Sequence, residues 1–101
     1  MGLTIAVETE RGECLERVGD PRNILARRLP SPDDTEYQCL GMIDLYGDTV
    51  FNYLQIPRFL DELHRIASPS PSPEESALFK RIEEMARRVA EERFYLKFIG
   101  D

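Results

Sequence analysis

The feature that most constrains the fold is one amphipathic stretch near the end of the sequence, residues 73–93. Its apolar residues recur at helical spacing and form a single stripe, namely Leu78, Ile82, Met85 and Val89. Ser72, Pro73 and Glu75 stand in the order of a capping box, with proline where its missing N–H costs nothing. We therefore predict a helix of about 30 Å that packs its apolar stripe on a sheet.

Short stretches of alternating apolar and polar residues predict the strands of that sheet. Residues 3–9 alternate cleanly, and residues 14–18 follow after a loop that contains Gly12, so the two should form a hairpin. Residues 94–99 alternate in the same way and predict a last strand. Residues 37–46 are apolar on both faces, which is typical of a central strand covered on both sides.

A turn signal follows this apolar run. Tyr46, Gly47, Asp48 and Thr49 have turn chemistry, and residues 49–54 then resume with β-branched and aromatic side chains. We interpret residues 49–54 as the returning strand of a second hairpin. A short helical turn is the alternative.

Two further helices and one connector are predicted. Asp20 and Pro21 are typical of a helix start and predict a helix over residues 20–30. Residues 57–67 place their apolar side chains on one helical face. Residues 68–73 alternate serine and proline, which excludes helix and sheet and predicts a solvated inter-helix connector.

Helices and strands thus mix without regular alternation, which predicts an α+β fold. The expected architecture is a mostly antiparallel sheet of four to five strands with three helices, the long one packed on one face. A chain of 101 residues is the size of one domain, residues 1–101, with residues 68–73 as an internal connector.

Charge and hydropathy exclude some classes of partner. The chain has 19 acidic and 13 basic residues, a formal net charge of −6, and such a field repels phosphate backbones. Nucleic acid is therefore not expected as a partner. We see no apolar stretch of membrane-spanning length and no signal-peptide pattern at the start, so we expect a cytoplasmic protein without a membrane partner.

The residues that most often carry chemistry are few and scattered. Cys14 and Cys39 lack metal-ligand spacing and are expected to be reduced, mostly buried thiols. His64 is the one histidine, and Asp61 on the same predicted helix supplies only a second ligand for a metal. We therefore predict no catalytic residue, no cofactor and no metal, and we expect that the protein is not an enzyme.

One group of polar side chains is a candidate interaction or turn site. Asp44 and Asp48 bracket the turn, Asn52 could converge with them, and Tyr46 lies between. An acid/base or cation site would need these side chains to point into a shared space. The simpler interpretation is that Asp48 accepts backbone N–H groups in the turn and Asn52 pairs with a loop backbone.

Acidic residues also gather around the first predicted hairpin. They are Glu8, Glu10, Glu13 and Glu16. Two interpretations stay open: a solvated hairpin tip, or an acidic docking surface for a protein partner.

The stretch CLGMIDLYGDTVFNYLQIPRFLDEL resembles small uncharacterised bacterial α+β proteins that carry a YGDTVFN-type turn after an apolar strand. The resemblance extends from the first strand to the last helix. It implies a fold and no activity, because that family has no assigned function.

These observations favour a small acidic cytoplasmic module that binds another protein, in one version an immunity- or antitoxin-like inhibitor. A self-associating domain is the first alternative. It would form a homodimer through sheet edges at residues 3–9 or 94–99. An enzyme or cation-binding protein that uses the Asp44–Asn52 turn is the second alternative.

Overall fold

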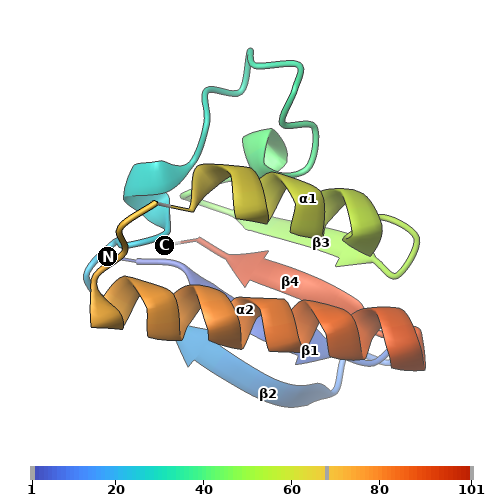
Figure 1. The fold of residues 1–101 in the computed structure, drawn as a ribbon. Helices are drawn as coiled ribbons and strands as arrows, with labels where there is room; N and C mark the ends of the chain where they lie inside the picture. Colours follow the sequence, from blue (N-terminus) through green and yellow to red (C-terminus); the bar gives the residue numbers. More distant parts are fainter. Residues whose placement is uncertain (1, 68, 101) are drawn as a thin grey trace.

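The computed structural model describes residues 2–67 and 69–100, which form a four-stranded sheet with two helices on one face (Figure 1). The strands are β1 (Thr4–Glu8), β2 (Cys14–Gly19), β3 (Asp48–Asn52) and β4 (Tyr95–Ile99). Every neighbouring pair is antiparallel, and the spatial order is β2-β1-β4-β3. The α+β class, the antiparallel sheet and the first hairpin are confirmed.

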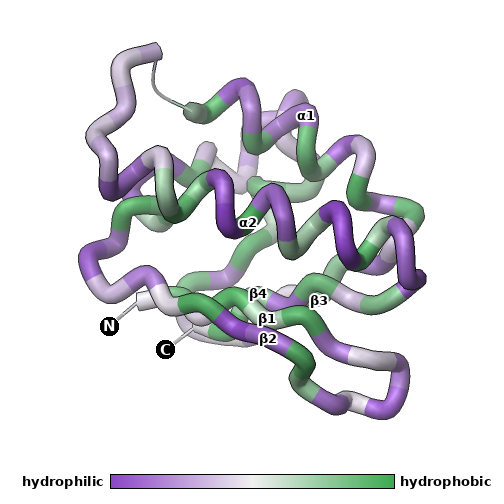
Figure 2. Tube along the Cα trace, turned by 60° about the horizontal axis from the view of Figure 1, so that its bottom comes forward, coloured by the Kyte–Doolittle hydropathy of each residue, from purple (hydrophilic) through white to green (hydrophobic). Residues whose placement is uncertain are grey.

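The helices are α1 (Ile56–Ile66) and α2 (Pro73–Glu92), so the described residues contain two α-helices and not the three predicted. The Ser72 hydroxyl accepts the Glu75 N–H at 3.1 Å, as the capping signature predicts. Arg93 adopts a left-handed φ of 59° and ends the helix. Figure 2 shows hydrophobic and hydrophilic residues alternating along α2, as expected for a helix with one buried face.

The core lies between the sheet and this helical layer. The predicted stripe of α2 is buried there, and α2 contacts β1, β4 and α1. Phe51, Phe59 and Phe98 pack with their ring centroids 5.6–5.8 Å apart. These rings come from β3, α1 and β4, so the aromatic cluster joins the edge strand β3 to its neighbour β4 and to helix α1.

The prediction of a helix over residues 20–30 is wrong. The segment forms turns and one short 3₁₀ helix, η1 (Ala26–Arg28). Asp20 is 1% exposed, and its carboxylate accepts backbone N–H groups from Ile24, Leu25 and Ala26. Asn23 has a left-handed φ of 57°, which interrupts helical geometry. Asp20 thus binds backbone N–H groups as a cap does, but the chain folds around its carboxylate and no α-helix follows.

The prediction of a central strand over residues 37–46 is also wrong. This segment carries a second short 3₁₀ helix, η2 (Leu40–Met42). The Glu62 carboxylate of α1, 1% exposed, accepts the N–H groups of Cys39 at 3.0 Å and Leu40 at 2.9 Å. These buried N–H groups bind a side chain, so they are not available to a sheet ladder.

The prediction of a second hairpin is therefore wrong as well, although its returning strand exists as β3. Residues 49–54 were expected to pair with residues 37–46, whereas β3 pairs with β4. The strand ends at Asn52, and a turn leads directly into α1. The strand order corrects one further expectation. Residues 3–9 and 94–99 contain β1 and β4, the two central strands, and the edges of the sheet are β2 and β3.

Candidate binding surface

The turn before β3 is held by its own hydrogen bonds. Asp44 Oδ1 accepts the Tyr46 N–H at 2.8 Å, and the Asp44 N–H donates to Thr49 Oγ1 at 3.0 Å. A Cβ at Gly47 would come within 2.8 Å of Asp44 Oδ2, so a side chain at this position would require the Asp44 carboxylate to shift. Tyr46 is left 73% exposed at the tip of this ordered turn.

The other two members of the predicted site point elsewhere. Asp48 Oδ2 lies 3.6 Å from Lys97 Nζ on the neighbouring strand. Asn52 Oδ1 accepts the N–H groups of Leu54 and Gln55 at 3.0 and 3.2 Å. Asp44, Asp48 and Asn52 therefore do not converge. Among the described residues, moreover, no three acidic, histidine or cysteine side chains lie so as to hold a metal ion.

The four glutamates of the first hairpin do not share one face. Glu16 points towards α2, where Arg88 Nη1 lies 2.6 Å and Arg81 Nη2 3.3 Å from its carboxylate. Glu8 lies on the open side of the sheet, 3.7 Å from Lys97 Nζ. Glu10 and Glu13 remain exposed near the tip. An acidic docking surface built from all four is not formed.

The cysteines and the histidine lie apart from one another. Cys14 is exposed on β2, contrary to the expectation of a buried thiol, and Cys39 is buried. Burial raises the pKa of the Cys39 thiol, and the neighbouring Glu62 carboxylate raises it further, so the thiol form is favoured at neutral pH. His64 is exposed on α1, with Nε2 2.7 Å from Glu83 Oε1 on α2.

The sequence carries a charge pattern that element-by-element reasoning missed. Between Arg28 and Arg58 the chain has no lysine, arginine or histidine, and it has five acids: Asp33, Asp34, Glu36, Asp44 and Asp48. The rest of the chain has 14 acidic against 13 basic residues, out of totals of 19 and 13. The excess negative charge thus belongs almost wholly to residues 29–57, which we call the acidic segment.

The acidic segment also carries most of the exposed apolar surface. Six large apolar side chains are exposed among residues 2–67 and 69–100, and five of them belong to this segment: Met42, Leu45, Tyr46, Val50 and Leu54. Met42 is 67% and Leu54 73% exposed. Single exposed apolar side chains are ordinary, but five in one acidic segment are a concentration that needs an explanation.

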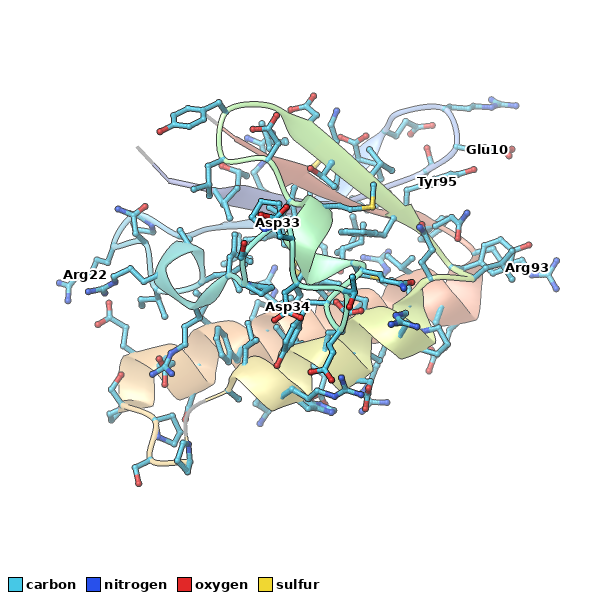
Figure 3. All side chains as sticks on the ribbon, turned by 90° about the horizontal axis from the view of Figure 1, so that it is seen from above. Glu10, Arg22, Asp33, Asp34, Arg93 and Tyr95 are labelled. Atoms are coloured by element: carbon cyan, nitrogen blue, oxygen red, sulfur yellow. The ribbon has the colours of Figure 1, made fainter. Side chains whose placement is uncertain are left out.

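Part of this segment projects from the body of the protein. Figure 1 shows the loop that precedes η2 rising beyond α1 at the top of the view. In Figure 3, Asp33 and Asp34 lie near the middle of the view, whereas Arg22 and Arg93 lie at its opposite ends. The acids of the loop are exposed and lie apart from these two arginines.

In the part of the chain that the structure describes, no helix is long and apolar enough to cross a membrane. The resemblance to small bacterial proteins with a YGDTVFN-type turn stays a prediction. Comparisons with protein-family models, with curated proteins and with solved structures found no match for this chain.

Proposed function

We propose that this protein is a binding module that docks a protein with a basic surface through its acidic segment. The observation that carries this proposal is the coincidence of uncompensated negative charge and exposed apolar side chains in residues 29–57. Complementary charge steers two proteins together and orients them. Aromatic and methionine side chains supply contact area in the core of an interface.

The order of the segment supports the same proposal. Glu62 binds the backbone of Cys39 and Leu40, and Thr49 Oγ1 joins the Asp44 N–H to the Met42 carbonyl oxygen. The exposed side chains of the segment are thus presented from a backbone with fixed hydrogen bonds. A surface already ordered before binding loses less conformational entropy when a partner docks.

A narrower version makes the module an inhibitor of the immunity or antitoxin type, which covers the basic cleft of a nuclease. Small size and the concentration of uncompensated acids in one segment of the sequence support this version. An acidic body placed over such a cleft competes directly with the phosphate backbone for the same arginines and lysines.

The proposal is tested by photo-crosslinking in the native host. Tyr46→benzoylphenylalanine places the photoreactive group in the acidic segment. The same substitution at Glu91, which is exposed on α2, is the matched control. We expect position 46 alone to crosslink one protein through a contact peptide rich in lysine and arginine. The purified partner should then bind less tightly as salt rises.

Equal crosslinking at both positions, or a contact peptide without basic residues, would overturn the proposal. Light scattering tests the self-associating alternative separately. A dimer at micromolar concentration that Tyr46→Ala dissociates would favour self-association. For the inhibitor version, the crosslinked partner should cleave nucleic acid and lose that activity when this protein is added.

A further inference from the structure

The acidic segment contains an open groove of about 400 Å³, formed by residues 32–42 alone. The residues that line it include the apolar Pro32, Tyr37 and Met42 and the acidic Asp34. The walls are held in place by the backbone, because the Tyr37 N–H donates to the Asp34 carbonyl oxygen and the Gly41 N–H donates to the Tyr37 carbonyl oxygen. The groove is therefore part of the ordered structure of the segment.

The polar side of the groove is negative. Asp34 is exposed, and its Oδ1 accepts the Glu36 N–H at 3.0 Å, which fixes the direction of the carboxylate. Asp33 and Glu36 are exposed beside it in the sequence. No base of the acidic segment can neutralise these three acids, since the segment contains none. A ligand for this groove must supply positive charge together with a flat or apolar surface.

We propose that the groove receives an arginine side chain from the partner, with the guanidinium on the Tyr37 ring and paired with the Asp34 carboxylate. This inference rests on the proposed function, because it names the chemistry by which the acidic segment recognises its basic partner. Arginine fits better than lysine for two reasons. Its planar guanidinium stacks on aromatic rings, and its paired N–H groups match a carboxylate. Its methylene stem can lie along Pro32 and Met42.

Two synthetic peptides test the inference on the intact protein. They have the same length and charge, and one carries arginines where the other carries lysines. Binding is followed by amide chemical shifts and by titration calorimetry at low and high salt. We expect both peptides to bind more weakly as salt rises, and the arginine peptide to bind about two- to fivefold more tightly.

Variants then locate the preference. Tyr37→Leu keeps an apolar side chain but removes the ring. Gly41→Leu introduces a side chain at the groove, where a Cβ would meet Ser31 and Pro32 atoms at an ordinary 3.5 and 3.9 Å. Leu15→Ala, a truncation of an exposed apolar side chain outside the segment, is the control. Each variant is used only if its melting temperature shows that it folds, and either groove variant suffices.

The outcomes separate the two proposals. The arginine preference should vanish in Tyr37→Leu or Gly41→Leu and persist in Leu15→Ala. Equal binding of both peptides, or a preference that survives a folded groove variant, would overturn the arginine site and leave the acidic docking surface standing. If neither peptide binds in a salt-dependent way, both this inference and the docking proposal are wrong.

Discussion

Helix α2 and the acidic segment use their charges in opposite ways. On α2, Arg88 lies between Glu16 and Glu92, at 2.6 and 2.8 Å, and Arg87 pairs with Glu83 at 3.1 Å. In the acidic segment, Asp34 and Asp44 accept N–H groups of their own loops, and within residues 2–67 and 69–100 only the Asp48 carboxylate of this segment forms an ion pair. The charges of α2 join elements of the fold together. Those of the segment shape loops and leave a net negative field.

This difference indicates where on this protein a function can be sought. A charge that is paired within the chain contributes to stability and is screened from a partner. A charge without a base nearby contributes little to folding, so its presence is better explained by something outside the chain. The following predictions test whether the two regions differ in this way.

The largest effect is expected at the carboxylate that joins the acidic segment to helix α1. Glu62→Ala removes the acceptor for two buried N–H groups and for Arg58 Nε, 3.1 Å away. We expect the free energy of unfolding to fall by about 3 kcal/mol, because buried donors are left without partners. Urea denaturation measures it, with Asp61→Ala, exposed on the same helix, as the control. A loss below about 1 kcal/mol would mean that Glu62 does not hold the segment.

A smaller effect is expected where the hairpin meets α2. Glu16→Gln weakens the contacts with Arg81 and Arg88. We expect a loss of about 0.5–1 kcal/mol at low salt that shrinks as salt is added, because the pairs are partly exposed. Glu13→Gln, exposed in the same hairpin, should leave stability unchanged. Equal losses of stability in the two variants would show that the ion pairs of Glu16 with Arg81 and Arg88 do not stabilise the fold.

A pH-dependent effect on stability is expected at Glu83 of α2, which contacts His64 of α1. Hydrogen bonds from His64 and then from Arg87 hold the pKa of Glu83 below its ordinary value of 4.5. A lowered folded-state pKa contributes stability that is complete above the unfolded-state value and is lost as pH falls through the folded-state value. The difference in stability between wild type and Glu83→Gln should therefore be small at pH 7, and shrink further below about pH 4. Thermal unfolding across this range measures it, and a difference that grows in acid would contradict it.

The smallest effect on stability is expected in the acidic segment itself. The double substitution Asp33→Lys and Glu36→Lys should change the free energy of unfolding by less than about 0.5 kcal/mol, since both side chains are exposed. The same protein should lose salt-dependent binding of the basic peptides. Glu10→Lys with Glu13→Lys makes an equal change of charge at the hairpin tip and should keep that binding. If the hairpin variant loses peptide binding to the same extent, binding depends on the total charge of the protein and not on the acidic segment.

The sequence predicted well those elements whose structure depends on neighbouring residues. Helix α2 and the β1–β2 hairpin follow from periodicity, a cap and a glycine turn, all of them short-range signals. The errors occurred where a buried carboxylate binds the backbone, either of its own loop, as Asp20 does, or of a distant segment. Residues 37–46 look like a strand until Glu62, 23 positions after Cys39, takes two of their N–H groups. No local pattern reveals such a bond.

The candidate site was predicted in part, for a related reason. The turn before β3 was found from turn chemistry, but its backbone N–H acceptor is Asp44 and not Asp48 as predicted. The directions of Asp48 and Asn52 could not be predicted without knowing which strand pairs with β3. The pairing with β4 gives Asp48 a lysine partner, and the turn into α1 engages Asn52. The acidic segment could have been found from the sequence alone, by counting charges along the chain.

The strand order has a consequence for how the protein reaches its native state. Strand β4 occupies the middle of the sheet, although it is the last of the four strands along the chain. Until it docks, β1 and β3 lack the strand that lies between them. The sheet therefore forms through pairings between residues far apart in the sequence, which should make it fold more slowly than a sheet built from hairpins alone.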